Sequence, residues 1–304
     1  MKVGYISDDI YLNHDTGKLH PESKERLIAI ADEMKDIEGN LLLLSPVKVS
    51  TKIVSLVHPL PYINHIQECC EKELEIDNDT TTSVESYEVA LQAVGAGIVA
   101  VDAIVNNEID RAFAAVRPPG HHASKQKAMG FCLFNNIAVT ARYAQEKGYK
   151  KIFIIDFDVH HGNGTQDIFY DDSSVFYFST HEEMSFPGTG SMKDIGIDEG
   201  EGYNFNHRLK YNSGDDEILK VYKEKLPSLV KEFNPDIILV SAGYDLHESD
   251  PLGGLNITTE GIRELVNGIL ELKSVPYIFM LEGGYDIDAL AKNVSVTIEE
   301  MMKE

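Results

Sequence analysis

Two acids and a histidine follow an apolar run in the middle of the chain at alternating positions. The run, residues 151–155, has the length and β-branched content of a buried strand, and Asp156, Asp158 and His160 come after it. In an extended chain alternate side chains project to the same side, so these three should converge while the apolar residues between them pack on the other side. Two carboxyl groups and an imidazole brought together in this way favour a divalent metal ion as their partner.

A catalytic zinc ion takes three protein ligands and keeps one position open. Asp158 and His160 supply two of them, and Asp245, which follows the apolar run 236–240, is the best candidate for the third. The alternative for Asp245 is a turn or helix-capping acid. Asp156 is interpreted as a carboxylate that orients a histidine, because such histidines usually donate their second ring N–H to an acid.

Two further features could transfer a proton and polarise a carbonyl group. His121 and His122 follow a stiff Pro-Pro-Gly turn, and one of them could carry a proton from the attacking water to a leaving amine. A pair of structural histidines is the alternative. Tyr285 follows two glycines and could donate its hydroxyl to an oxyanion, although ordinary loop tyrosines also occur there. His161 would point away from His160 and is interpreted as a core histidine.

The elements that must position these residues alternate between strand and helix. This alternation predicts a three-layer α/β/α fold with a mostly parallel central sheet, in which ligands bind at the carboxyl ends of the strands. We see no linker, so residues 1–304 should form a single domain. A helix should open at Pro21 and end near Asn40, and 67–84 should form a surface loop. Strands are predicted at 2–7, 111–116, 151–155, 175–178, 236–240 and 276–281, and further helices at 87–105, 135–147, 216–233, 259–273 and 288–303.

Composition narrows the class of protein. The 304 residues are 43% hydrophobic, which suffices for one large core. The net charge, 27 − 50 = −23, argues against a nucleic-acid partner, and a solubilising acidic surface is favoured over one that steers cationic substrates. We find neither a signal peptide nor an apolar run near the length of a membrane span, so we expect a cytoplasmic protein without a membrane partner. The three cysteines, Cys69, Cys70 and Cys132, are too few for a disulfide framework.

Six motifs occur in an order that resembles the zinc-dependent histone deacetylase family, including its bacterial and archaeal acetylpolyamine and acetoin-utilisation relatives. With His20-Pro21-Glu22 and the helix at Tyr87, the resemblance extends over nearly the whole chain. The motifs are Arg-Pro-Pro-Gly-His-His-Ala at 117–123, Gly-Phe-Cys at 130–132, Asp-Phe-Asp-Val-His-His-Gly-Asn-Gly-Thr at 156–165, Phe-Pro-Gly-Thr-Gly at 186–190, Ser-Ala-Gly-Tyr-Asp at 241–245 and Glu-Gly-Gly-Tyr at 282–285.

The resemblance implies an arginase/deacetylase-like fold and a role for each matching residue. The zinc ligands would be Asp158, His160 and Asp245, with iron(II) as the alternative metal. The catalytic residues would be His122 as general base and acid, His121 as its electrostatic partner oriented by Asp156, Tyr285 as the group that polarises the substrate carbonyl, and Asn163 as the contact of His122. An asparagine at position 163 is similar to the class II type of the family.

The resemblance also implies a narrow channel for an extended alkyl chain. Gly130, Phe131 and Phe186 would form its walls, although the two aromatic residues could instead belong to the core. Asp79 would lie at the rim, and Arg26 would line the inner side from which acetate leaves. A structural monovalent cation, usually potassium, would be held by Asp156, Asp158, His160, Ser179 and Thr180.

The position after Asp250-Pro251 bears on the substrate. Polyamine-selective relatives resemble this stretch but carry a glutamate where this chain has Leu252. Leucine favours an acyl-lysine peptide or protein, or another acylated amine, without excluding polyamines.

The leading hypothesis is therefore a metal-dependent amidohydrolase that removes acetyl or related acyl groups from primary amines. A two-metal ureohydrolase of arginase type is a rival, but it needs a further acid where Gly243 stands. A catalytically silent binding protein is another alternative, although such a protein would not need a proton shuttle and an oxyanion donor together.

Overall fold

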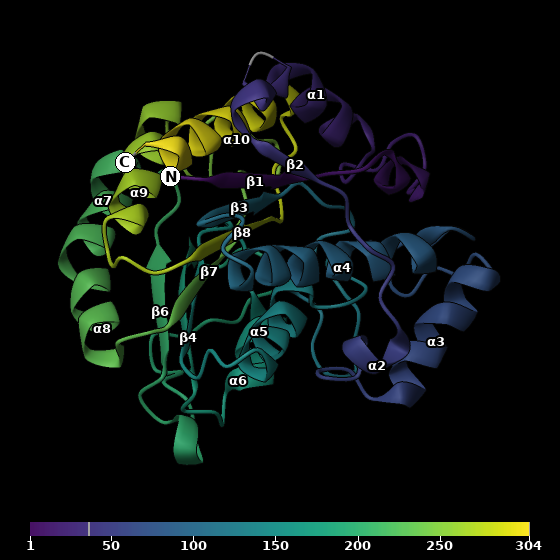
Figure 1. Cartoon of the computed structure of the whole chain (residues 1–304), viewed down its shortest axis with the longest axis horizontal. Helices are drawn as coiled ribbons and strands as arrows, with labels where there is room; N and C mark the ends of the chain where they lie inside the picture. The colour runs from purple at the N-terminus through teal and green to yellow at the C-terminus, as the bar shows by residue number, and fades with distance from the viewer. Residues whose placement is uncertain (36, 304) are drawn as a thin grey trace.

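The computed structural model describes residues 1–35 and 37–303, and its centre is one eight-stranded sheet (Figure 1). The strand order is β2-β1-β3-β8-β7-β4-β5-β6, and every pairing is parallel. The strands are β1 (Val3–Ile6), β2 (Leu42–Leu44), β3 (Arg111–Ala114), β4 (Ile152–Asp156), β5 (Val175–Glu182), β6 (Asn204–Leu209), β7 (Ile237–Ala242) and β8 (Tyr277–Leu281).

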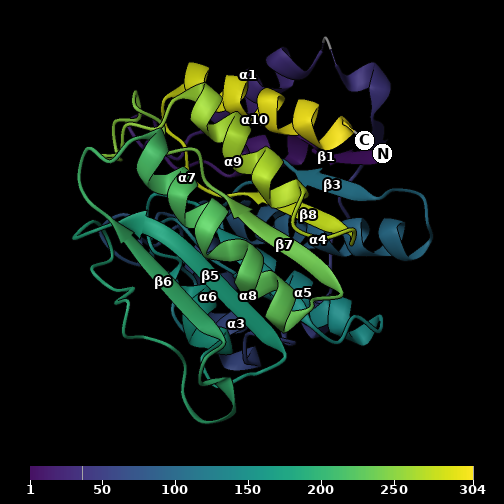
Figure 2. The same ribbon diagram turned by 90° about the vertical axis from the view of Figure 1, so that its left-hand side faces the viewer.

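Helices cover both faces of the sheet, which confirms the predicted three-layer α/β/α class (Figures 1 and 2). On one face lie α7 (Asp215–Glu224), α8 (Leu226–Phe233), α9 (Thr259–Leu270) and α10 (Ile287–Met302), with α1 (Glu25–Met34) packed against α10. On the other lie α4 (Ser86–Val105), α5 (Asn136–Glu146) and α6 (Asn163–Phe169), with α2 (Thr51–Val54) and α3 (Leu60–Glu71) outside them.

The central strands are apolar throughout because both of their faces are covered. Every residue of β4, β7 and β8 is buried, as expected for parallel strands between two helical layers. Helix α4 is long and apolar enough to cross a membrane by length and composition alone, but 72% of its most apolar window is buried inside the protein. It is placed as a core helix between the sheet and the outer helices.

Several predicted boundaries were wrong. The first long helix begins at Glu25 rather than Pro21, because the preceding segment forms a turn in which Ser23 N donates to Pro21 O, and it ends at Met34. The predicted loop 67–84 starts inside α3, and the predicted helix 216–233 is two helices because Pro227 cannot donate a backbone hydrogen bond. The short edge strand β2, the polar edge strand β6 and the helices α2, α3 and α6 were not predicted.

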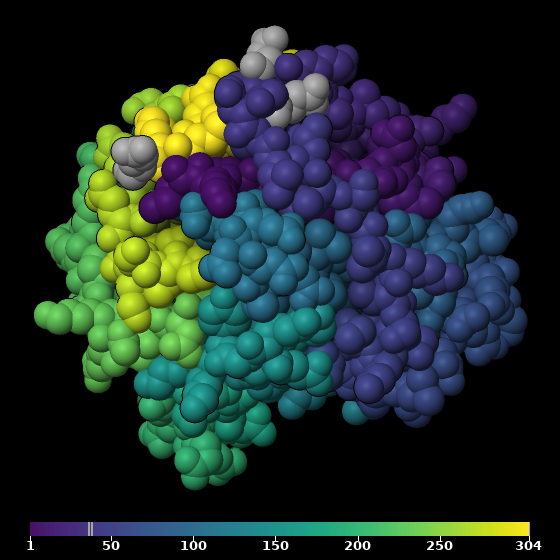
Figure 3. Space-filling view, in the orientation of Figure 1, coloured from purple at the N-terminus to yellow at the C-terminus, as the bar shows by residue number. Residues whose placement is uncertain are grey.

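The strand order leaves a crevice at the middle of the sheet. The chain passes from β3 directly to β4 in sequence, yet β8 and β7 lie between them in space. The carboxyl ends of these four strands therefore meet at one edge, which is the place where open α/β sheets bind ligands. The N-terminal strand β1 contacts the C-terminal helix α10, and purple atoms of the N-terminal region adjoin yellow atoms of the C-terminal region on the surface (Figure 3).

Candidate active site

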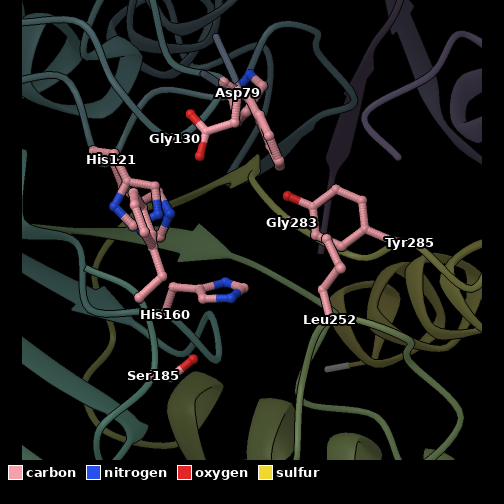
Figure 4. A pocket seen from close by; sticks show the side chains of 12 residues that line it. Asp79, His121, Gly130, His160, Ser185, Leu252, Gly283 and Tyr285 are labelled. Carbon is pink, nitrogen blue, oxygen red and sulfur yellow. The ribbon is translucent and has the colours of Figure 1, made fainter. Parts of the chain in front are cut away.

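A cavity of about 300 Å³ opens at the carboxyl ends of the central strands (Figure 4). His121 and His160 lie on one side of it, with Tyr285 and Leu252 on the other. Pro119, Ser185 and Gly283 line it although they were not predicted. The predicted site residues that line it are Asp79, His121, His122, Gly130, Phe131, His160, Phe186, Leu252 and Tyr285.

The three predicted metal ligands lie together, and one of them, His160, lines this cavity. Asp158, His160 and Asp245 each offer one ligand atom, and these atoms lie within 4.8 Å of one another. His160 Nδ1 is 3.2 Å from Asp158 Oδ1 and 3.1 Å from Asp245 Oδ2. Ligand atoms about 3.3 Å apart form the edges of a tetrahedron with zinc bonds of about 2.0 Å, so the donor set and its spacing fit a zinc ion.

Backbone groups from neighbouring strand ends hold the two acids. Asp158 Oδ2 accepts from Gly283 N at 2.8 Å, and Asp245 Oδ1 accepts from Val159 N at 2.9 Å. Burial and the charge of Asp158 raise the pKa of Asp245 to about 7. Burial lowers the pKa of His160, but the two carboxyl groups outweigh this and raise it well above its usual value. The cluster thus favours added positive charge, which a divalent ion would provide.

The two adjacent histidines have different partners and opposite proton affinities. His121 Nδ1 lies 3.1 Å from Asp156 Oδ2, and His122 Nδ1 lies 2.9 Å from Asn163 Oδ1. Burial lowers the pKa of His121, but the nearby carboxylates outweigh it and raise this pKa to about 10. Burial and the charged His121 hold the pKa of His122 well below its usual value. These shifts favour the charged form of His121 and the neutral form of His122, which is able to accept a proton.

Tyr285 presents its hydroxyl to the cavity from the opposite side (Figure 4). Burial and the charge of Asp245 raise the pKa of the hydroxyl well above its usual value, so it remains a hydrogen-bond donor. Arg26 lies behind the ring, 5.1 Å from its centroid, and donates to Gly284 O at 2.7 Å and Glu282 O at 2.6 Å. Arg26 is not part of the lining of this cavity, and these two carbonyl groups hold its guanidinium behind the Tyr285 loop. Its place on the inner side from which acetate leaves stays a prediction.

The predicted channel walls surround the histidines. Gly130 has a positive φ of 56°, and a Cβ there would come within 2.4 Å of His122 Cδ2, so only glycine fits. Phe186 packs edge-on against His122 with ring centroids 5.0 Å apart. Phe131 N donates to the buried Thr80 Oγ1 at 3.2 Å, a contact that sequence reasoning missed.

Glu282 is a further functional candidate that sequence reasoning missed. Its Oε2 accepts from Gly120 N at 2.7 Å and His121 N at 3.1 Å, so it holds the segment that carries both histidines. Its Oε1 accepts from Ser241 Oγ at 3.0 Å. An acid directly after a predicted buried strand was the signal that identified Asp156, and the same signal at the end of β8 could have identified Glu282.

The remaining predicted residues lie behind the cavity. Ser179 is the register partner of Asp156 on β5, and its hydroxyl contacts His181 Nδ1 at 2.9 Å. Thr180 Oγ1 lies 3.2 Å from the Tyr222 hydroxyl. A monovalent cation near these residues stays a prediction. His161 is buried, as expected of a core histidine, and lies within hydrogen-bond distance of Thr189 Oγ1 and Gln166 Oε1.

A buried ion network supports the site from the N-terminal side. Glu22 Oε1 accepts from Arg26 Nη1 at 3.1 Å, and Glu22 Oε2 accepts from Arg117 Nη2 at 2.8 Å. All three side chains are fully buried. Burial raises the pKa of Glu22, but the two guanidinium groups outweigh it and hold this pKa at about 2. The network joins the Tyr285 loop, through Arg26, to the segment of His121, which begins at Arg117.

Glu22→Gln should lower the free energy of unfolding by about 3–5 kcal/mol, because it leaves two buried guanidinium groups without their counter-ion. Since the pKa of Glu22 is lowered from 4.5 to about 2 in the folded protein, its contribution is complete above about pH 4.5 and is lost as the pH falls towards 2. Urea unfolding at pH 7 and pH 3 measures both effects. The exposed Glu25→Gln is the control, and equal stability of the two variants at pH 7 would contradict the assignment.

Comparisons with known proteins agree with this geometry. The sequence model described as the histone deacetylase domain matches residues 20–301. A "Probable deacetylase" of Archaeoglobus fulgidus is 37% identical over 95% of this chain and 82% of its own length. "Histone deacetylase 14, chloroplastic" of Arabidopsis thaliana is 39% identical over 94% of this chain and 73% of its own. The crystal structure of the HDA15 HD domain superposes with a TM-score of 0.93 at 31% identity, covering 98% of this chain and 88% of that one.

Proposed function

Because the chain belongs to the histone deacetylase family, we propose that it is a zinc-dependent amidohydrolase that removes acetyl or related acyl groups from lysine side chains or similar primary amines. The observation that carries the proposal is one cavity that brings together a metal-ligand cluster, a neutral histidine and a protonated tyrosine. These are the groups that hydrolysis of an unactivated amide requires.

Each group around the cavity has a separate role in the proposed reaction. A bound divalent ion would supply a Lewis acid that polarises the acyl carbonyl group and acidifies the attacking water. His122 takes a proton from this water and returns it to the leaving amine, while the protonated His121 stabilises the developing negative charge. Tyr285 donates its hydroxyl to the acyl oxygen. Phe131 and Phe186 hold the alkyl chain of the substrate and exclude water from the site.

Iron(II) would use the same ligands as zinc, and we propose potassium as the structural monovalent cation. The test loads the protein with zinc and measures amine release from acyl-lysine peptides and acylpolyamines of increasing acyl length. The proposal expects turnover of at least one linear acyl amide. A metal-loaded and folded protein that hydrolyses none of them would refute it.

Metal stoichiometry separates the proposal from the two-metal ureohydrolase alternative. A second ion would need an acid at position 243, but a Cβ there would come within 2.0 Å of Asp158 Oδ2, one of the proposed ligand side chains. One divalent ion per chain is expected, and two would favour the alternative.

Leu252→Glu should shift the enzyme towards cationic substrates. Leu252 lies in the cavity lining and is 40% exposed, so a carboxylate there would meet a polyamine at the mouth. We expect the ratio of kcat/KM for an acetylpolyamine to that for an acetyl-lysine peptide to rise by about tenfold, most strongly at low salt. The neutral Leu252→Gln is the matched control, and an equal shift in both variants would show that charge is not the cause.

A further inference from the structure

Asp250 is a buried carboxylate in the loop after β7, behind the wall of the cavity. It is 7% exposed, and the cavity lining does not include it. Its Oδ2 accepts from Tyr285 N at 2.6 Å and Asp286 N at 3.1 Å, and its Oδ1 accepts from Leu252 N at 3.0 Å. One side chain thus bonds to the backbone of two residues that line the cavity from different loops.

We propose that Asp250 is a positioning residue that fixes the backbone of Tyr285 and of Leu252 relative to each other. The inference rests on the proposed function, because it concerns the group that polarises the acyl oxygen and the wall residue that meets the amine side of the substrate. Asp250 itself touches neither substrate nor metal. It acts through the two residues whose amide groups it binds.

Tyr285 depends on this contact because the glycines before it impose little conformational preference of their own on the backbone. Two glycines precede it, and Gly284 has a positive φ of 121°. Arg26 binds the carbonyl group of Gly284 from one side, and Asp250 binds the amide groups of Tyr285 and Asp286 from the other. Arg26 and Phe131 contact the Tyr285 ring, but its hydroxyl points into open cavity (Figure 4). The position of the hydroxyl therefore depends on where these backbone contacts hold the Tyr285 backbone. A displacement of about 1 Å at such a donor can cost about 100-fold in rate.

Only a carboxylate can satisfy all three donors. Its two oxygen atoms both accept hydrogen bonds, whereas an amide has one accepting oxygen and an NH₂ group that can only donate. In Asp250→Asn the NH₂ group would face either the Leu252 amide or the amides of Tyr285 and Asp286. A buried N–H group without an acceptor is costly, so one of the two loops should move.

The first experiment measures kcat with an acetyl-lysine peptide. Asp250→Asn should lower kcat by about 10- to 100-fold with unchanged metal content, because the oxyanion donor is displaced. Glu248→Gln makes the same chemical change at an exposed position of the same loop and should leave kcat unchanged. A folded Asp250→Asn protein with wild-type kcat would overturn the inference.

A double-mutant cycle separates positioning from general damage. Since Asp250 acts through the Tyr285 hydroxyl, Asp250→Asn should lower kcat by less than about threefold further in the Tyr285→Phe background. A further loss as large as that in the wild-type background would show a purely structural role. The preference between acetyl-lysine peptide and acetylpolyamine should also shift in Asp250→Asn, because Leu252 moves with the loop. An unchanged preference would contradict the part of the inference that concerns Leu252.

Amide hydrogen exchange tests the contact without catalysis. The amides of Tyr285 and Asp286 should exchange slowly in the wild-type protein, and at least about tenfold faster in Asp250→Asn. If that variant does not fold, the wild-type measurement still tests the inference, because free exchange of both amides in the wild-type protein would overturn it. A wild-type protein that hydrolyses no acyl amide would refute the proposed function, whereas normal turnover with unprotected amides would refute only the role of Asp250.

Discussion

Tyr285→Phe is expected to lower kcat on an acetyl-lysine peptide by about 10²–10³-fold, because it removes the hydrogen bond to the oxygen on which negative charge develops. The ring should stay in place, since Arg26 lies 5.1 Å from its centroid and Phe131 packs edge-on at 5.8 Å. KM and metal content should therefore change little. Steady-state kinetics with metal analysis of the same preparation measures these quantities.

The matched control for this variant is Tyr62, a buried tyrosine. The Tyr62 hydroxyl donates to Leu133 O at 2.6 Å outside the cavity lining, so Tyr62→Phe should lower stability but preserve kcat. Full activity of Tyr285→Phe would refute the role of its hydroxyl. A loss of metal in this variant would show instead that the tyrosine supports the ligand cluster.

His160→Ala should abolish metal binding and activity together, with kcat reduced by about 10⁴-fold or more, because only two protein ligands remain. His160 is the most informative ligand to remove. Its ring makes hydrogen bonds only with Asp158 and Asp245 among the described residues, whereas the two acids also hold the backbone of neighbouring strand ends. Its loss therefore tests the metal site with the least damage to the fold.

Calorimetric titration or elemental analysis measures how many metal ions each variant binds per chain. Wild-type protein should bind one divalent ion per chain, and His160→Ala should bind none at equal metal concentration. His65→Ala, which removes an exposed histidine of α3, is the control and should keep both metal and activity. Retained stoichiometric binding in His160→Ala would show that the ligand set has been assigned incorrectly.

The metal-ligand candidates could be predicted because they follow buried strands. An apolar run that ends in acids and histidines is uncommon, and the carboxyl ends of parallel strands share one edge of the sheet. Asp158 and Asp245 were therefore expected to meet although they are 87 positions apart in sequence (245 − 158). The structure places both beside His160. The catalytic roles of His121, His122 and Tyr285 stay predictions, now with geometry that supports them.

Edge elements and helix boundaries were harder to predict. Strand β2 is only three residues long and partly exposed, and β6 is polar at several positions, so neither shows the apolar signal of a central strand. The turn before α1 and the break between α7 and α8 depend on local backbone bonds around proline, which hydrophobic periodicity does not register. None of these segments contributes to the lining of the cavity, and the predicted site residues were unaffected by the errors.

Which side chains gather at the sheet edge could be inferred from the sequence, because side chains alternate along a strand and an alternation of strands and helices predicts a parallel sheet. The groups that hold these side chains in place became apparent only in the folded protein. Glu282 binds the amides of Gly120 and His121, and Asp250 binds those of Tyr285 and Leu252. The acceptor is a side chain, but each donor is a backbone N–H, a group that every residue except proline carries. The residue type at the donor position therefore does not indicate such a contact, and the contact can be recognised only in the folded protein.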